Sequence, residues 1–153
     1  MLRPYTAADF PALYAIEEIC FQPPIRYSRL YLQGLIASSR SATWVAEEDS
    51  QIAGFTVVEW FDDPGAGCIA YIQTIEVAAG FRRRGIAAQL LRRAEASAQA
   101  AGARLIWLHV ESTNEAAIAL YRAHGFVHNG REPHYYARGR NAEVYSKTIL
   151  SAP

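Results

Sequence analysis

The sequence is poor in cysteine, in net charge and in long apolar runs. Its two cysteines, Cys20 and Cys68, cannot build a disulfide framework and lack zinc-type spacing, and His124, His128 and His134 are scattered without the spacing of a metal site. Fifteen basic residues balance fifteen acidic ones, so no overall field draws the chain to nucleic acid or to an anionic membrane. The N-terminus lacks the apolar core of a secretion signal, and no apolar run approaches about 18 residues. We therefore expect a cytoplasmic protein that binds no metal, nucleic acid or membrane.

The remaining composition is that of an ordinary folded protein. Of the 153 residues, 51% are hydrophobic and 20% are charged, which is far from the profile of a disordered chain. A chain of this length fits one domain with a buried core. We therefore expect a single domain over residues 1–153.

Periodicity in the first half predicts two helices and an antiparallel meander. Thr6 is placed to cap a helix with an apolar stripe, Pro23-Pro24 ends that helix, and Ser28 is placed to cap a second one. Two polar turn clusters then separate runs rich in β-branched and aromatic residues. Strands are expected at Leu2–Tyr5, Thr43–Ala46, Ile52–Trp60 and Cys68–Val77.

The second half has a different order of elements. After Gly85 the apolar period becomes helical and predicts a long helix that ends near Gly102. Leu105–Val110 is a compact apolar run, and the succession of strand, helix and strand makes it parallel to the strand before the helix. Asn114 is placed to cap a short helix that ends at Gly125. The last strands are expected at Phe126–Asn129 and Glu143–Leu150.

A basic turn joins the strand that ends at Val77 to the long helix, with the sequence Arg82-Arg83-Arg84-Gly85-Ile86-Ala87. Free N–H groups and the positive end of the dipole attract phosphate to such a helix start, and Gly85 leaves room for close approach. Taken alone, three arginines are more often a solvated face. The turn has neither the glycine spacing of a dinucleotide-binding fold nor the ending of a P-loop.

Two further motifs follow the basic turn in the sequence. Together with Asn114-Glu115-Ala116-Ala117-Ile118-Ala119-Leu120-Tyr121 and Gly125-Phe126 downstream, the order Arg-x-x-Gly-x-Ala resembles the acetyl-CoA motifs of the GNAT superfamily. The resemblance implies an α/β (α+β) fold with a mixed, mostly antiparallel sheet of about six to seven strands, four flanking helices and a parallel strand pair splayed at the cofactor site. It also implies that acetyl-CoA is bound. The residues assigned to it are Ile75, Val77, Arg82, Arg83, Arg84, Gly85, Ile86, Ala87, Asn114, Ala117 and Tyr121, although Asn114 serves equally well as a helix cap.

Within the superfamily, the segment from Trp107 to Asn114 is similar to protein N-terminal acetyltransferases of the RimI and NatE types. His109 together with Tyr71 matches the NatE type. An α-ammonium must lose a proton before its nitrogen can attack a thioester, and an imidazole with an ordinary pKa of about 6.5 can accept that proton directly or through water. The resemblance implies that His109 is the base, that Tyr71 positions the water, and that Tyr121 donates a hydrogen bond to the departing thiolate. Each of the three is otherwise a plausible core residue.

Two segments resemble the parts of NatE-type enzymes that hold the acceptor peptide. Pro23, Pro24, Ile25 and Tyr27 match in type the loop that contacts the first residue, although Pro23 stands where that family has Phe, and Tyr135-Tyr136 resembles the closing hairpin. Such a groove favours a peptide or protein N-terminus, a ribosomal protein among them. A small-molecule amine and a non-catalytic acyl-CoA-binding role are the alternatives. Glu17, Glu18 and Glu76 rank low as acids near this mouth.

Overall fold

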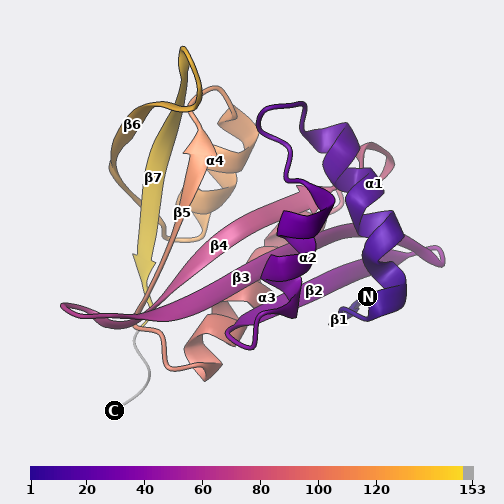
Figure 1. Ribbon diagram of the computed structural model, residues 1–153, viewed down its shortest axis with the longest axis horizontal. Coiled ribbons are helices and arrows are strands. Elements are labelled where there is room, and N and C mark those ends of the chain that lie inside the picture. The colour runs from indigo at the N-terminus through magenta and orange to yellow at the C-terminus, as the bar shows by residue number, and fades with distance from the viewer. Residues whose placement is uncertain (150–153) are drawn as a thin grey trace.

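The computed structural model describes residues 1–149, which form one seven-stranded sheet with helices on both faces (Figure 1). The strand order is β1-β2-β3-β4-β5-β7-β6, and β4 with β5 is the parallel pair in an otherwise antiparallel sheet. The strands are β1 (Leu2–Pro4), β2 (Ser41–Glu48), β3 (Gln51–Asp63), β4 (Gly67–Val77), β5 (Leu105–Glu111), β6 (Val127–Ala137) and β7 (Arg140–Thr148). The α-helices are α1 (Phe10–Cys20), α2 (Arg29–Ala37), α3 (Ile86–Ala100) and α4 (Glu115–Ala123). The predicted fold class is confirmed.

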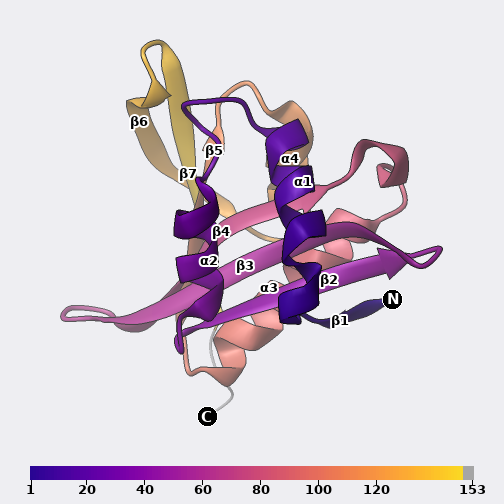
Figure 2. The same ribbon diagram turned by 45° about the vertical axis from the view of Figure 1, so that its right-hand side comes forward.

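The helices divide the core between the two faces of the sheet, as Figure 2 shows. Leu13 and Leu32, from α1 and α2, pack with Val57 of β3 on one face. On the other face, Leu91 of α3 and Tyr121 of α4 belong to the largest buried cluster. Side chains on β4 therefore meet α1 on one face and α3 on the other.

A bulge in β4 decides which of its side chains reach each face. Val57 of β3 pairs with Thr74, but its neighbour Val58 pairs with Ile72, so Gln73 is the extra residue of the bulge. Because side chains alternate along a strand, the bulge reverses the faces beyond it. Ile72 and Ile75 accordingly both pack in the cluster under α3. Glu76 is thereby directed to the opposite face, toward α1.

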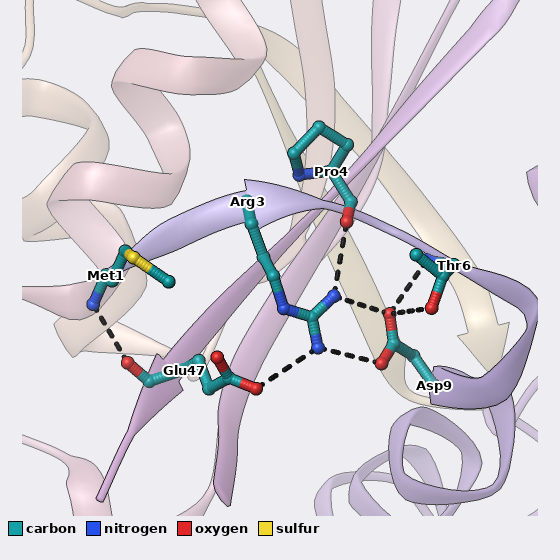
Figure 3. A network of polar contacts seen from close by, with 6 residues as sticks. All are labelled: Met1, Arg3, Pro4, Thr6, Asp9 and Glu47. Carbon is teal, nitrogen blue, oxygen red and sulfur yellow. Dashed lines mark hydrogen bonds and ion pairs between the residues drawn. The ribbon is translucent and has the colours of Figure 1, made fainter. Parts of the chain in front are cut away.

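The start of α1 is tied to the sheet edge by one carboxylate (Figure 3). The short 3-10 helix Ala7–Asp9 precedes α1, and Asp9 accepts a hydrogen bond of 2.8 Å from the backbone N–H of Thr6. The guanidinium of Arg3 donates two further hydrogen bonds of 2.8 Å to Asp9 and contacts Glu47 at 3.3 Å. These bonds lower the pKa of Asp9 to about 2 and link β1 to α1 and β2.

The first strand of the last hairpin is longer than the sequence predicts. The strand predicted at Phe126–Asn129 is β6, which runs from Val127 to Ala137, through a proline and a residue with positive φ, His134. Those residues are typical of turns, but register shifts in the β6–β7 pairing accommodate them. Of the strand predicted to end at Leu150, that last residue lies outside the described part of the chain. No helix within residues 1–149 combines the length and apolarity needed to cross a membrane.

Candidate active site

The centre of the sheet opens where β4 and β5 separate. Their parallel pairing covers only Ile69–Tyr71 against Leu105–Trp107, and beyond it the strands diverge (Figure 1). Two cavities of about 510 Å³ and about 340 Å³ lie there. The residues that line both are Phe21, Ile75, Asn114, Ala117 and Tyr121. The cavities therefore meet at a shared wall.

The larger cavity is bounded by the start of α3. Gly85, at the N-cap of this helix, has φ 77°, and no side chain caps the helix. By contrast, Ser28 accepts a hydrogen bond from Tyr31 N at the start of α2, and Asn114 accepts one from Ala117 N at the start of α4. The first-turn N–H groups of α3 thus face the cavity without a capping side chain, as an anion-binding helix start requires.

Two of the three arginines in this turn line the larger cavity. Arg82 and Arg83 do so, and Arg82 is anchored by a hydrogen bond of 3.2 Å from its Nε to Val77 O. Arg84 is not among the lining residues, and its guanidinium lies over the ring of Phe81 at 5.1 Å. The other residues predicted to hold the cofactor, from Ile75 to Tyr121, all line at least one of the two cavities.

An aromatic cluster forms one wall of the smaller cavity. The hydroxyl of Tyr71 lies 2.7 Å from Nδ1 of His109, and the imidazole is stacked on Tyr135 with a centroid distance of 4.1 Å and an interplanar angle of 11°. The His109 side chain is only 7% exposed. Burial raises the pKa of Tyr71 well above its usual value, so the phenol stays protonated at neutral pH, and the tautomer of His109 decides which of the two groups donates.

Tyr121 occupies the wall between the cavities. It is buried among the apolar residues under α4, with its ring against Phe126. Burial raises the pKa of Tyr121 to about 12. The hydroxyl therefore stays protonated at neutral pH and is available as a hydrogen-bond donor at the junction.

The predicted acceptor loops approach the smaller cavity from two sides. Pro24, Ile25 and Tyr27 of the α1–α2 loop line it, as do Tyr135 and Tyr136 of the hairpin. The loop is fixed by the hydroxyl of Tyr27, which donates to the carbonyl of Gln73 in the bulge of β4 at 3.1 Å. Pro23, which comes directly before these loop residues, does not line the cavity.

A buried pair of carboxyl groups supports this loop, and the sequence ranked both of them low. Glu17 is fully buried and its Oε2 accepts a hydrogen bond of 3.1 Å from Tyr27 N. Glu76 is 3% exposed and accepts one of 2.7 Å from Thr74. The other oxygen of each group, Oε1, has no partner among the described residues other than the facing carboxyl. Burial, followed by hydrogen bonding to Glu17, raises the pKa of Glu76 well above its ordinary value.

The helical period contained a signal for this pair. Glu17 follows Leu13 and Tyr14 by four and three residues, which places it on the buried face of α1. A carboxyl group on that face needs a partner. Glu76 was harder to identify, because regular alternation along β4 without the bulge would direct its side chain to the face under α3, away from α1. Glu18, the third acid considered, is exposed.

The arrangement suits group transfer between two bound molecules. The larger cavity offers backbone N–H groups and arginines to a molecule that carries phosphate, and the smaller one offers a phenol–imidazole pair to a second molecule. The cavities meet at Tyr121, and molecules bound in the two cavities would come into contact there. Sequence-predicted residues from β4, β5, α3, α4 and both loops are thus brought together.

Comparison with known proteins agrees with this geometry. Residues 10–126 match the acetyltransferase (GNAT) family. The N-terminal acetyltransferase A complex catalytic subunit NAA10 of Arabidopsis thaliana is 30% identical over 151 residues, which cover 97% of this chain and 77% of that protein. Streptothricin acetyltransferase of Streptomyces lavendulae is 34% identical over 121 residues, 79% of this chain and 61% of that protein. The structure of Arabidopsis thaliana Naa50 with the bisubstrate analogue CoA-Ac-MVNAL superimposes with a TM-score of 0.81 at 25% identity, covering 97% of this chain and 98% of that chain.

Proposed function

The chain belongs to the GNAT family of acetyltransferases, which use acetyl-CoA, and we propose that its acceptor is the α-amino group at the N-terminus of a peptide or protein. The observation that carries this proposal is the smaller cavity, which has Tyr27, Tyr135 and Tyr136 at its entrance and the Tyr71–His109 pair in its wall. Tyrosine hydroxyls suit the backbone of a chain end, and their rings suit its first side chain.

The residues around the larger cavity fit the donor. Acetyl-CoA supplies a thioester carbonyl that a neutral amine can attack. We assign its pyrophosphate to the N–H groups at the start of α3, with Arg82 and Arg83 alongside. The pantetheine arm is assigned to the edge of β4 at Ile75 and Val77, which β5 leaves unpaired by diverging. This assignment directs the thioester end toward Tyr121 at the junction.

The acceptor amine needs a base, because an α-ammonium with a pKa near 8 is mostly protonated at pH 7. We assign this role to His109. Its Nδ1 faces the hydroxyl of Tyr71, so the proton reaches the imidazole by way of that hydroxyl. The amine nitrogen then regains the lone pair with which it attacks the carbonyl.

Tyr121 is assigned to the leaving group. A thiolate departs more readily when a donor supplies a hydrogen bond or a proton to the sulfur. The Tyr121 hydroxyl lies at the junction of the cavities and keeps its proton until the thiolate forms, since its pKa is about 12.

A library of peptides with different first residues, incubated with acetyl-CoA, tests the acceptor class. We expect acetylation of free N-termini and none of peptides with a blocked N-terminus. On the best peptide, His109→Ala and Tyr71→Phe should each lower kcat/KM by about 100-fold, the usual worth of a general base. Tyr5→Phe is the matched control, because Tyr5 lines neither cavity. A His109→Ala enzyme with wild-type kcat/KM between pH 6 and 9 contradicts the assignment.

The likeness to streptothricin acetyltransferase favours a small-molecule amine as the second candidate. A polyamine and aminoglycoside panel beside the peptide library separates the two. If small amines are acetylated and no peptide is, the proposed acceptor class is wrong. The roles of His109 and Tyr71 are then tested with the same variants on the small amine.

A further inference from the structure

His109 has a second ring nitrogen, Nε2, that the reaction described above does not use. Its Nε2 is buried and makes no hydrogen bond among the described residues. A buried imidazole nitrogen without a hydrogen bond is costly, and a catalytic role is one of the recognised reasons for such a group in a native protein. The carboxylate oxygen Oε2 of Glu132 lies 3.2 Å from this nitrogen.

The contact with Glu132 favours one tautomer of neutral His109. A carboxylate can only accept a hydrogen bond, so the neutral ring beside it carries its proton on Nε2. Nδ1 is then an acceptor and receives the hydrogen bond of the Tyr71 hydroxyl across 2.7 Å.

We infer that Glu132 is a positioning residue that holds His109 in the form protonated at Nε2 and stabilises the imidazolium produced when Nδ1 takes a proton. Glu132, His109 and Tyr71 then form a carboxylate–imidazole–phenol relay. The contact of 3.2 Å lies outside hydrogen-bond geometry, and the Glu132 side chain is 51% exposed. A small rotation of this half-exposed side chain brings the carboxylate into hydrogen-bond geometry, and catalytic hydrogen bonds often tighten in this way when substrate binds.

The relay rests on the proposed function, and its proton transfers balance. One N–H bond of the acceptor ammonium breaks and its proton goes to the Tyr71 oxygen, while the Tyr71 O–H bond breaks and its proton goes to Nδ1. Tyr71 ends neutral, the imidazole ends with one positive charge, and the amine nitrogen has its lone pair. Glu132 remains an anion throughout and faces the new cation.

Other groups around the imidazole do not replace this carboxylate. Tyr71 from β4 and Tyr135 from β6 are phenols, and β7 places Val144 opposite His109. Glu111, two residues along β5, is engaged by Arg140 through two hydrogen bonds. Among the described residues, Glu132 is the carboxylate in contact with His109.

The experiment compares wild type with Glu132→Gln by proton–nitrogen NMR of the histidine rings. In wild type we expect neutral His109 to carry its proton on Nε2. In Glu132→Gln the titration midpoint of His109 should move about 0.5 pH unit lower, as expected for loss of a half-exposed ion pair. Glu48→Gln, which removes the same charge from β2, should leave it unchanged. A ring protonated at Nδ1, or equal midpoints in all three proteins, overturns the inference.

Kinetics then separate this inference from the proposed function. With whichever amine the wild type acetylates, the acid limb of kcat/KM for Glu132→Gln should move by the same 0.5 pH unit. Glu132→Asp should restore part of the shift, and Glu132→Gln should have no further effect in a His109→Ala background. A changed KM with an unmoved NMR midpoint indicates a merely structural role and overturns the inference. A moved midpoint with an unmoved acid limb supports the contact and contradicts His109 as the base.

Discussion

The two cavities that meet at Tyr121 are built in different ways. The phosphate-binding part of the larger one is a short continuous stretch, the turn before α3, which offers mainly backbone N–H groups, while the end of α1, β4 and α4 complete its wall. The smaller one is formed by side chains from the α1–α2 loop, β4, β5 and β6, and the buried pair of carboxyl groups lies between the two cavities, with Glu17 lining the smaller one and Glu76 the larger one. A site made of backbone depends on local conformation, whereas one made of side chains depends on packing between distant segments. Substitutions should therefore impair the two cavities in different ways.

The largest expected effect is at the smaller cavity, with Glu17→Leu. This change leaves the N–H of Tyr27 without its acceptor and leaves the buried carboxyl of Glu76 without its partner. Each loss costs about 1 to 3 kcal/mol, so urea denaturation should show a free energy of unfolding lowered by about 3 kcal/mol. Calorimetric affinity for CoA should be unchanged.

The matched control is Glu18→Leu, one residue further along α1 and exposed. Exposed substitutions usually change the free energy of unfolding by less than about 0.5 kcal/mol. Equal destabilisation by the two variants, or a loss of CoA affinity in Glu17→Leu, contradicts the separation of the two cavities.

The second prediction concerns pH and the partner of Glu17. The pKa of Glu76 is raised above its ordinary value of 4.5 in the folded protein. Between that value and the raised one, the unfolded chain has lost a proton that the folded protein keeps. The free energy of unfolding therefore falls as pH rises, by up to about 1.4 kcal/mol per pH unit. Below the ordinary pKa both states hold the proton, so the pH dependence vanishes and the stabilisation is fully present.

Glu76→Gln removes this dependence, because an amide keeps the shape and a hydrogen-bond donor but does not titrate. Urea denaturation of both proteins at several pH values from 5 to 8 measures it. We expect the wild type to lose stability relative to the variant as pH rises. Parallel curves indicate that Glu76 is already ionised in the folded protein.

The contrast between the cavities also explains what the sequence could predict. The strand order of the meander, the parallel β5 and the basic turn follow from local patterns, and all are present. Asn114 was identified in the same way, because a cap and its helix are neighbours in sequence. These features need no knowledge of distant contacts.

The acid pair and the long hairpin could not be predicted in this way. The bulge at Gln73 directs Glu76 toward α1, and it arises from the pairing of β3 with β4 rather than from any local motif. Likewise, Glu132 reaches His109 because β6 continues past the predicted end at Asn129 and pairs with β7, which in turn pairs with β5. The alternation of side chains along a single strand reveals neither the bulge in β4 nor the full length of β6.

The smallest expected effect is at the larger cavity, with Gly85→Ala. Gly85 has φ 77°, and an added Cβ meets no atom within 4 Å. The cost is therefore conformational and amounts to about 1 kcal/mol. Because the turn is exposed, we expect it to relax and to displace the N–H groups at the start of α3. Affinity for CoA, measured by calorimetry, should fall about fivefold, with the KM for the acceptor unchanged.

Gly80→Ala tests whether the left-handed backbone is the cause. Gly80 lies in the same connection, in the 3-10 helix Ala79–Phe81, and an added Cβ there also meets nothing within 4 Å. Its φ is not positive, so alanine adopts it without strain, and we expect CoA affinity to stay at the wild-type value. If both alanines weaken CoA equally, the turn is sensitive to any added side chain, and backbone conformation no longer distinguishes the larger cavity from the smaller one.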